Sequence, residues 1–167
     1  APGAGGAFYT TDLSIGNPAA TTVAATLAFL GNGKDGRSGP TRDVLIPGRG
    51  VTTFVDALKS AFGITGNDFG AIRVTSASPR LVVLGQTSTP AANGGTFGQS
   101  VPAAAPADLV VHGSPRSIVG IREDSLFRTN LIVANANEST IEVKLTLVTD
   151  DGRTLGPITL DPFLPLE

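Results

Sequence analysis

The chain carries an internal repeat, and no other feature of the sequence limits its fold so strongly. The segment FRTNLIVANANESTIEVKLTLV, residues 127–148, aligns without a gap with residues 9–30 at a separation of 118 positions. Thr, Leu and Asn recur at identical places, and large apolar residues replace one another at others. We therefore expect two related units rather than one undivided domain.

Alternating apolar residues in the first copy predict β-strands. Val23, Ala25, Leu27 and Phe29 share one face at the period of two that a strand imposes. The 21 glycines and 12 prolines separate short runs of Thr, Val and Leu, which is typical of many strands joined by turns. We predict an all-β chain of antiparallel β-sandwich units.

The repeat also suggests where the two units lie. We expect a first β-sandwich at residues 1–100 and a second, shorter or incomplete β-sandwich at residues 101–167. One short helix is predicted near residues 56–62, with Asp56 capping its start and Gly63 ending it.

Further strands are predicted from the remaining apolar runs. Residues 70–76 and 80–87 read as a hairpin-like pair, with residues 81–84 buried on both faces. Residues 89–107, rich in Pro, Ala and Gly, predict a connection. The candidate strands of the second half are residues 109–111, 117–121, 127–134, 141–149 and 155–160, with a hairpin turn at Asp151 and Gly152 between the last two.

The same alternation assigns a core to each unit. The expected first core is Leu13, Ile15, Val23, Leu27, Phe29, Ile72, Val74, Leu81 and Val83, and the expected second core is Leu131, Val133, Ile141, Val143, Leu145 and Leu147.

Composition excludes several functional classes and favours one location. The net charge is −2 without a block of either sign, so no electrostatic footprint for nucleic acid is visible. No apolar run approaches the roughly 20 residues of a membrane span. The chain contains no cysteine, only three of its twelve basic residues are lysine, and APGAGGA at the start lacks a charged region, which together favour a processed, extracellular or cell-surface protein.

Several motifs resemble a known family. In the first copy they are FYTTDLSIGNP, VTTFVDAL and GTFGQSVP, and in the second LFRTNLIVANAN and TDDGRTLG. Together they resemble the tandem immunoglobulin-like β-sandwich repeats of exported or cell-surface bacterial proteins, a family of largely unknown function. The resemblance implies two immunoglobulin-like antiparallel β-sandwich units and a secreted location, and it assigns no catalytic residue.

Candidate catalytic residues are few. His112 is the only histidine, and Ser114 follows two positions later. Neighbours at that spacing in an extended segment do not form an oriented nucleophile–base pair, and no G-x-S-x-G elbow is present. The chain has one tyrosine, Tyr9, and no tryptophan, so few rings of the kind that stack on carbohydrate are present. We predict that the protein is not an enzyme.

Oxygen-bearing residues near turns are the other candidates, because calcium binds such ligands. No run of them matches the spacing of a calcium loop, and Asn and Asp also serve turns through their own hydrogen bonds. We predict no cofactor and no metal site. The residues considered are Asn32, Asp35, Asn67, Asp68, Asp150 and Asp151.

These observations favour a non-enzymatic structural or adhesive extracellular protein that associates with itself by β-strand addition, including extension into a filament. The neighbouring copy's residues 1–11 or 158–167 would donate the strand to an open edge of the second unit. Two alternatives for that edge are that the chain is part of a longer repeat protein, or that residues 108–121 complete the unit. The alternative function is a polysaccharide- or protein-binding accessory module of a larger secreted protein.

Overall fold

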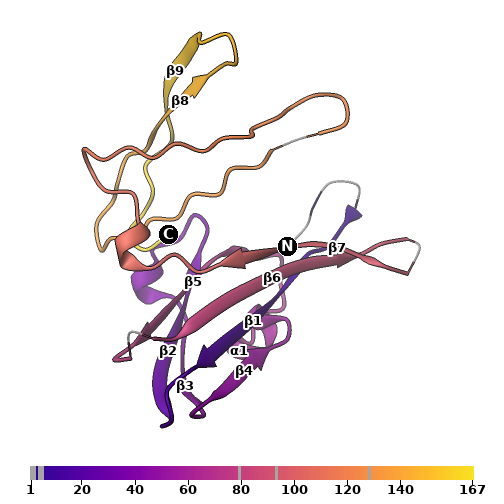
Figure 1. Ribbon diagram of the computed structural model, residues 1–167, viewed down its shortest axis with the longest axis vertical. Coiled ribbons are helices and arrows are strands. Elements are labelled where there is room, and N and C mark those ends of the chain that lie inside the picture. Colours follow the sequence, from indigo (N-terminus) through magenta and orange to yellow (C-terminus); the bar gives the residue numbers. More distant parts are fainter. Residues whose placement is uncertain (1–2, 4–5, 79, 93, 128) are drawn as a thin grey trace.

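The fold is mostly antiparallel β-sheet. The computed structural model describes residues 3, 6–78, 80–92, 94–127 and 129–167. Its strands form a four-stranded sheet of order β4-β1-β6-β7, a three-stranded sheet of order β3-β2-β5 and a two-stranded sheet of β8 and β9 (Figure 1). The prediction of an all-β chain is confirmed.

Seven strands and most of the helical turns belong to the first unit. The strands are β1 (Thr10–Asn17), β2 (Val23–Gly31), β3 (Thr41–Ile46), β4 (Gly50–Phe54), β5 (Gly70–Ser76), β6 (Val82–Pro90) and β7 (Thr96–Pro102), followed later by β8 (Lys144–Val148) and β9 (Thr154–Thr159). The helical elements are η2 (Gly36–Ser38), α1 (Ala57–Phe62) and η3 (Pro106–Asp108).

The core of the first unit lies where the four-stranded and three-stranded sheets face each other. Leu13 and Ile15 of β1 meet Leu27 of β2 in this buried cluster, and each of these side chains is almost completely removed from solvent. Every predicted residue of this core is buried or half-buried. The cluster is completed by Ile46, Phe54, Ala57 and Ala61, with Val44, Phe62, Ile72, Val74, Leu81 and Val83 packed against it.

Helix α1 lies at the predicted place, but its start is built differently. Asp56 adopts a left-handed conformation with φ of 48° and makes no side-chain cap; instead its main-chain N–H donates to Asp12 Oδ1 at 2.8 Å. The expected capping role of Asp56 is therefore wrong. Gly63, with φ of 70°, ends the helix as predicted, since its N–H bonds Leu58 and Lys59 carbonyls.

The expected pairing of residues 70–76 with residues 80–87 is also wrong. Strand β5 pairs with β2, whereas β6 pairs with β1 and β7, so the short connection between them crosses from one sheet to the other. Strand β6 is central in its sheet, yet Val82 and Leu84 point away from the core and are exposed. The expectation of burial on both faces is therefore wrong, since only the face of β6 that carries Val83 packs against the core.

The predicted connection at residues 89–107 contains a strand. β7 pairs with β6 along its whole length, from Pro90 opposite Thr96 to Leu84 opposite Pro102. All seven residues of β7 are exposed. The strand is thus held by main-chain pairing at the edge of the sheet, which leaves little apolar signal in the sequence.

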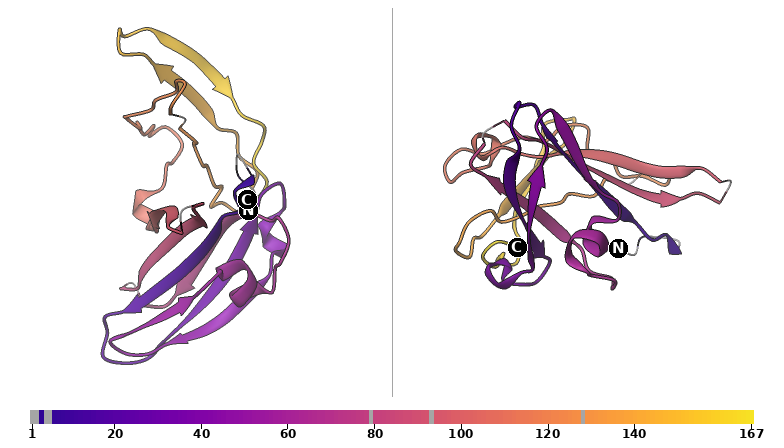
Figure 2. Two further views of the ribbon diagram at one scale, coloured as in Figure 1. Left: turned by 90° about the vertical axis from the view of Figure 1, so that its right-hand side faces the viewer. Right: turned by 90° about the horizontal axis from the view of Figure 1, so that it is seen from below.

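The second half of the chain differs most from expectation. Figure 2 shows a long irregular path between β7 and the β8–β9 hairpin. Among the described residues, 109–111 contribute only a bridge from Val111 to Ser114, and neither 117–121 nor 129–134 forms a strand. The hairpin turn at Asp151 and Gly152 lies where predicted, between β8 and β9.

The expected second core is correspondingly incomplete. The side chains of Leu131 and Leu147 are 44% and 43% exposed, so their assignment to a core is wrong. Val133, Ile141, Val143 and Leu145 are only half-buried. The reason is physical: no sheet of described residues lies across this face as the four-stranded sheet lies across β2.

Equivalent substitutions in the two copies should therefore differ in cost. Leu27→Ala empties a fully buried site and should lower the free energy of unfolding of the first unit by about 2–5 kcal/mol. Leu145→Ala, at the same place in the repeat, removes a half-buried side chain and should cost well under half as much. Urea unfolding followed by circular dichroism measures both, and equal losses would contradict this account.

Candidate functional site

A buried asparagine ties three segments of the first unit together. Asn17, at the end of β1, is 2% exposed. Its Nδ2 donates to the carbonyl oxygens of Thr21, Ile46 and Pro47 at 2.8, 3.1 and 3.2 Å, and its Oδ1 accepts from the Ala19 N–H at 3.0 Å. The side chain thus fixes the end of β1, the start of β2 and the end of β3. We call this arrangement the asparagine corner.

The second copy builds the same corner with different residues. Asn135 is fully buried, and its Nδ2 donates to the Ser139 and Leu164 carbonyl oxygens at 2.8 and 2.7 Å. Its Oδ1 accepts from the Asn137 N–H at 2.9 Å. Each partner stands 118 positions after its counterpart in the first corner. The repeat therefore extends as far as Leu164, and its local hydrogen bonding is reproduced.

The second corner presents a short segment, residues 165–167, to the first unit. Leu166 is 1% exposed and packs against Ala28, Leu30 and Ala71 on the outer face of the three-stranded sheet. The Pro165 carbonyl oxygen accepts from the Gly36 N–H at 2.9 Å, and Glu167 Oε1 accepts from the Gly33 N–H at 2.8 Å. We call this contact the joint.

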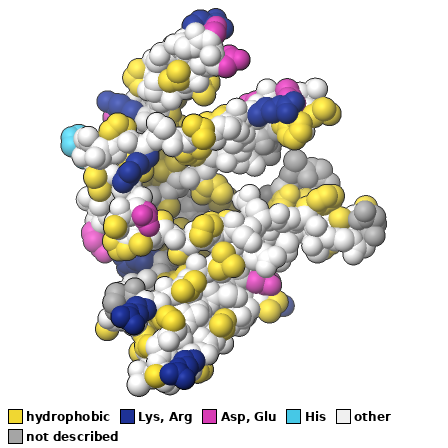
Figure 3. All heavy atoms as spheres, in the orientation of Figure 1, with side chains coloured by type: hydrophobic (Ala, Val, Ile, Leu, Met, Phe, Trp, Pro, Cys, Tyr) yellow, Lys and Arg dark blue, Asp and Glu magenta, His cyan; other side chains and the backbone are white. Residues whose placement is uncertain are grey.

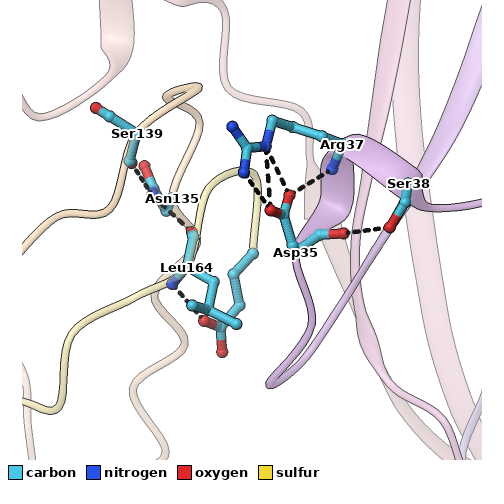
Figure 4. Close-up of polar contacts among 7 residues, drawn as sticks. Asp35, Arg37, Ser38, Asn135, Ser139 and Leu164 are labelled. Carbon is cyan, nitrogen blue, oxygen red and sulfur yellow. Dashed lines mark hydrogen bonds and ion pairs between the residues drawn. The ribbon is translucent and has the colours of Figure 1, made fainter.

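Gly36 is the residue that makes the joint possible. A Cβ placed on Gly36 would lie 1.9 Å from the Leu166 carbonyl oxygen, a distance at which the main chains must move apart. The loop that carries Gly36 is held by Asp35, whose Oδ1 accepts from the Arg37 N–H at 3.0 Å and from Arg37 Nε at 2.9 Å. Figure 4 shows this loop facing the Asn135 corner.

Two carboxylates fix the position of the joint. Glu167 Oε2 accepts from the Leu164 N–H at 2.7 Å, so this side chain joins its own segment to the loop of the first unit. Arg73 Nη1 and Glu138 Oε1 form an ion pair of 3.4 Å between β5 and the second corner. Both partners of that pair are largely exposed, so it adds little stability.

The hydrogen bonds from Arg37 hold the pKa of Asp35 below its usual range, first through the side chain and then through the main-chain N–H. A carboxylate whose pKa is lowered on folding contributes stability at neutral pH, and that contribution is lost as the pH falls through the lowered pKa. Asp35 lies at the surface, so solvent weakens this effect.

His112, considered for catalysis, and Tyr9, considered for an aromatic platform, are not among the residues that form the joint. His112 occupies the exposed turn between Val111 and Ser114, where the Ser114 N–H donates to the Val111 carbonyl oxygen at 3.0 Å. Tyr9 is half-buried just before β1. The geometry around His112 is that of a tight turn.

Two of the candidate calcium ligands, Asp35 and Asp68, line one hollow beside Lys34, whereas Asp151 lies in the β8–β9 turn. Asp35 bonds Arg37, Asp68 Oδ1 accepts from Lys34 Nζ at 2.6 Å, and Asp151 bonds Thr149 and Arg153 in the β8–β9 turn. Within the described ranges, no three acidic or histidine side chains gather into one cluster. Nor does any described helix have the length and hydropathy to cross a membrane.

The outer face of the three-stranded sheet also carries a shallow groove of about 560 Å³, beyond the part that Leu166 covers. Small side chains of β2 form its floor, and the exposed Leu45 stands at one side. The lining residues include Ala24, Thr26, Asp43, Leu45, Thr75 and Ser76.

Sequence reasoning missed the joint, although the sequence contains part of the signal. Pro165 follows Pro47, and Asp161 follows Asp43, at the same separation of 118 positions. These pairs show that residues 159–165 belong to the repeat as the counterpart of β3. The contact of Leu166 with Gly36 leaves no such signal, because it joins positions that are not equivalent in the two copies.

No protein-family model, no curated protein and no solved structure matches this chain.

The asparagine corner should be a strong determinant of stability. Asn17→Ala leaves the buried Ile46 carbonyl oxygen and the partly buried Thr21 carbonyl oxygen without this donor, and should lower the free energy of unfolding by about 1–3 kcal/mol. Asn17→Asp keeps the acceptor for Ala19 but removes the donors, and should cost at least as much at neutral pH. Urea unfolding measures both losses. An Asn17→Asp variant whose free energy of unfolding equals that of the parent would contradict the assignment of these bonds.

The joint should open when Gly36 gains a Cβ. We expect Gly36→Ala to speed hydrogen exchange at the Leu166 amide at least about tenfold, because the added atom collides with the main chain of Leu166. Gly66→Ala is the matched control, since only an Asp68 oxygen 4.0 Å away approaches its Cβ. Exchange followed by NMR decides the point, and equal rates in the two variants would show that Gly36 does not hold the joint.

Proposed function

We propose that the protein is a non-enzymatic structural or adhesive component, extracellular or at a cell surface, built from immunoglobulin-like β-sandwich repeats. In this proposal it associates with itself by β-strand addition, through the two edges of its four-stranded sheet. The observation that carries the proposal is that β7 and β4 are both edge strands without a charged residue. Natural proteins usually protect such edges with charge.

The directions of the two edge strands suit head-to-tail addition. β4 and β6 are each antiparallel to their common neighbour β1, so they run in the same direction, and β7 is antiparallel to β6. β7 therefore runs opposite to β4, and β7 of one copy can pair antiparallel with β4 of the next. Two different edges meet in this contact, so the sheet extends as a filament unless the rotation between copies closes a ring.

The inner face of β7 supplies an apolar surface for the contact. Phe97 and Val101 stand opposite Thr89 and Gly85 of β6 on the face that looks toward the core. They remain 67% and 48% exposed, because the three-stranded sheet does not reach beneath β7. Figure 1 shows β7 at the free side of its sheet. The inner face of an added copy would cover these side chains.

The extracellular part of the proposal is supported by composition and by the repeat. A chain without cysteine, with three lysines among twelve basic residues, fits export. The two asparagine corners fit a protein assembled from copies of one unit. The alternative, a binding module for polysaccharide or protein, is favoured by the groove beside Leu45, and a saturable ligand for that groove would support it.

A pair of double variants tests the role of the β7 edge. Phe97→Lys with Val101→Lys places two charges on the inner face, where a covering copy would have to bury them, and should abolish assembly. Thr96→Lys with Ser100→Lys adds the same charge to the outer face of the same strand and should keep assembly. Light scattering over a concentration series, with electron microscopy of the same samples, reports the outcome.

Two results would contradict the proposal. One is a parent protein that stays monomeric at high concentration, and the other is an equal effect of the two double variants. The second result would show that charge alone, rather than the inner face of β7, controls the association.

A further inference from the structure

The second copy contains a segment whose counterpart in the first unit, β1, pairs with a strand on each side within one sheet. β1 pairs with β4 on one side and with β6 on the other, in registers that place Leu13 opposite both Phe54 and Gly85. The counterpart of β1 is residues 128–135, and residues 129–135 pair with no strand in the described part of the chain. We call residues 129–135 the acceptor segment.

The acceptor segment is already positioned at one end. Asn135 is buried in its corner and makes the counterparts of three side-chain bonds of Asn17, those to Thr21, Ile46 and Ala19. The counterparts of β2 and β3 also lie side by side, since Ile141 bridges Phe163 and the Leu160 N–H donates to the Val143 carbonyl oxygen at 3.0 Å. β9 itself corresponds to residues 36–41, so β8 and β9 pair in a register that β2 and β3 do not use. Three of the strand positions of the first unit are therefore represented in the second.

The side chains that strands would cover are exposed. Leu131 is 44% exposed where Leu13 is 4% exposed, and Val133 is half-buried where Ile15 is fully buried. Figure 3 shows apolar side chains on the surface of this upper part of the molecule. Leu131 and Val133 repeat the core-facing positions of Leu13 and Ile15, but no strand of the described residues flanks them.

We propose that the acceptor segment binds a polypeptide that carries the strand pattern of β4 and β6, pairing with one strand on each side. The first unit shows what such a partner looks like. It is a further copy of the strand set of residues 50–102, which lies around β1 in the first unit. This surface is separate from the β7 edge.

The register of the first unit specifies the partner's residues. On the β4 side, Gly50 stands opposite Asn17 and Phe54 opposite Leu13, so the partner carries glycine opposite Asn135 and an aromatic residue opposite Leu131. A glycine is needed there because a Cβ on Gly50 already approaches the Pro47 side chain to 3.0 Å, and Pro165 occupies the equivalent place.

The register between β1 and β6 specifies the residues of the partner's second strand. Val83 stands opposite Ile15, and Gly85 opposite Leu13. The partner strand therefore places an apolar residue opposite Val133 and a small residue opposite Leu131, next to the aromatic residue supplied from the other side. A strand that lacks this alternation turns its apolar face to solvent when it pairs.

The test joins a copy of residues 50–102 to the full chain directly after Glu167. Glu167 stands 118 positions after Arg49, so the joined copy enters the repeat in register. The matched control carries Phe54→Asp and Val83→Asp in the joined copy only, leaving the first unit intact. Hydrogen exchange of the acceptor segment, measured by mass spectrometry, is the readout.

We expect the joined copy to slow exchange in the acceptor segment by about 100-fold, while the control leaves the rate within about threefold of that in the parent chain. Unchanged exchange with the parent-sequence copy would overturn the proposal. Equal protection by the control copy would also overturn it, because the register would then not matter. Protection that instead grows with the concentration of the parent chain would replace the proposed occupant with a second copy.

Discussion

The structure depends on a buried amide that bonds main-chain groups of three segments. Asn17 is both donor and acceptor, and it reaches the end of β1, the start of β2 and the end of β3 at once. A carboxylate lacks the donors and an apolar side chain lacks both functions, so the position demands asparagine. Once this corner is closed, the alternation along β1 and β2 directs Leu13, Ile15 and Leu27 into one core.

A comparison of the two copies distinguishes the effects of contacts that are near in sequence from those of contacts that are distant in sequence. Asn135 reproduces three hydrogen bonds of Asn17 even though the described residues before it, 129–134, form no strand. In each corner two partners lie within four residues and the others about 30 residues away, so the corner needs only the nearby chain and β3 or its counterpart. A strand such as β1 needs neighbours about 40 and 70 residues away in sequence, and its burial fails where such neighbours are not in place.

Sequence patterns predicted those parts of the fold in which one face is buried. The alternation at Leu13, Ile15 and Leu27 predicted both the strands and the core, and the Asp151–Gly152 pair predicted the β8–β9 turn. The patterns failed for β7, whose residues are all exposed and which pairs with β6 along its whole length at the edge of the sheet. They also failed for Leu131 and Leu147, whose sequence fits a core that only partner strands create. Asn17 and Asn135 were visible as a repeated pair, but their role required the positions of the carbonyl groups.

The contact between Leu166 and Gly36 gives the pair of units a polarity. In the first unit the place of Leu166 is taken by Gly48, where a Cβ would lie 2.1 Å from the Ala20 carbonyl oxygen. In the second unit the place of Gly36 is taken by Thr154, whose side chain would fill the space that the incoming main chain needs. Each copy thus provides only one side of the joint, Gly36 in the first copy and Leu166 in the second, and the two copies cannot exchange these roles. The joint therefore forms in one order along the chain. The second copy has no glycine at the place of Gly36, so it cannot form the same contact with a copy that follows it.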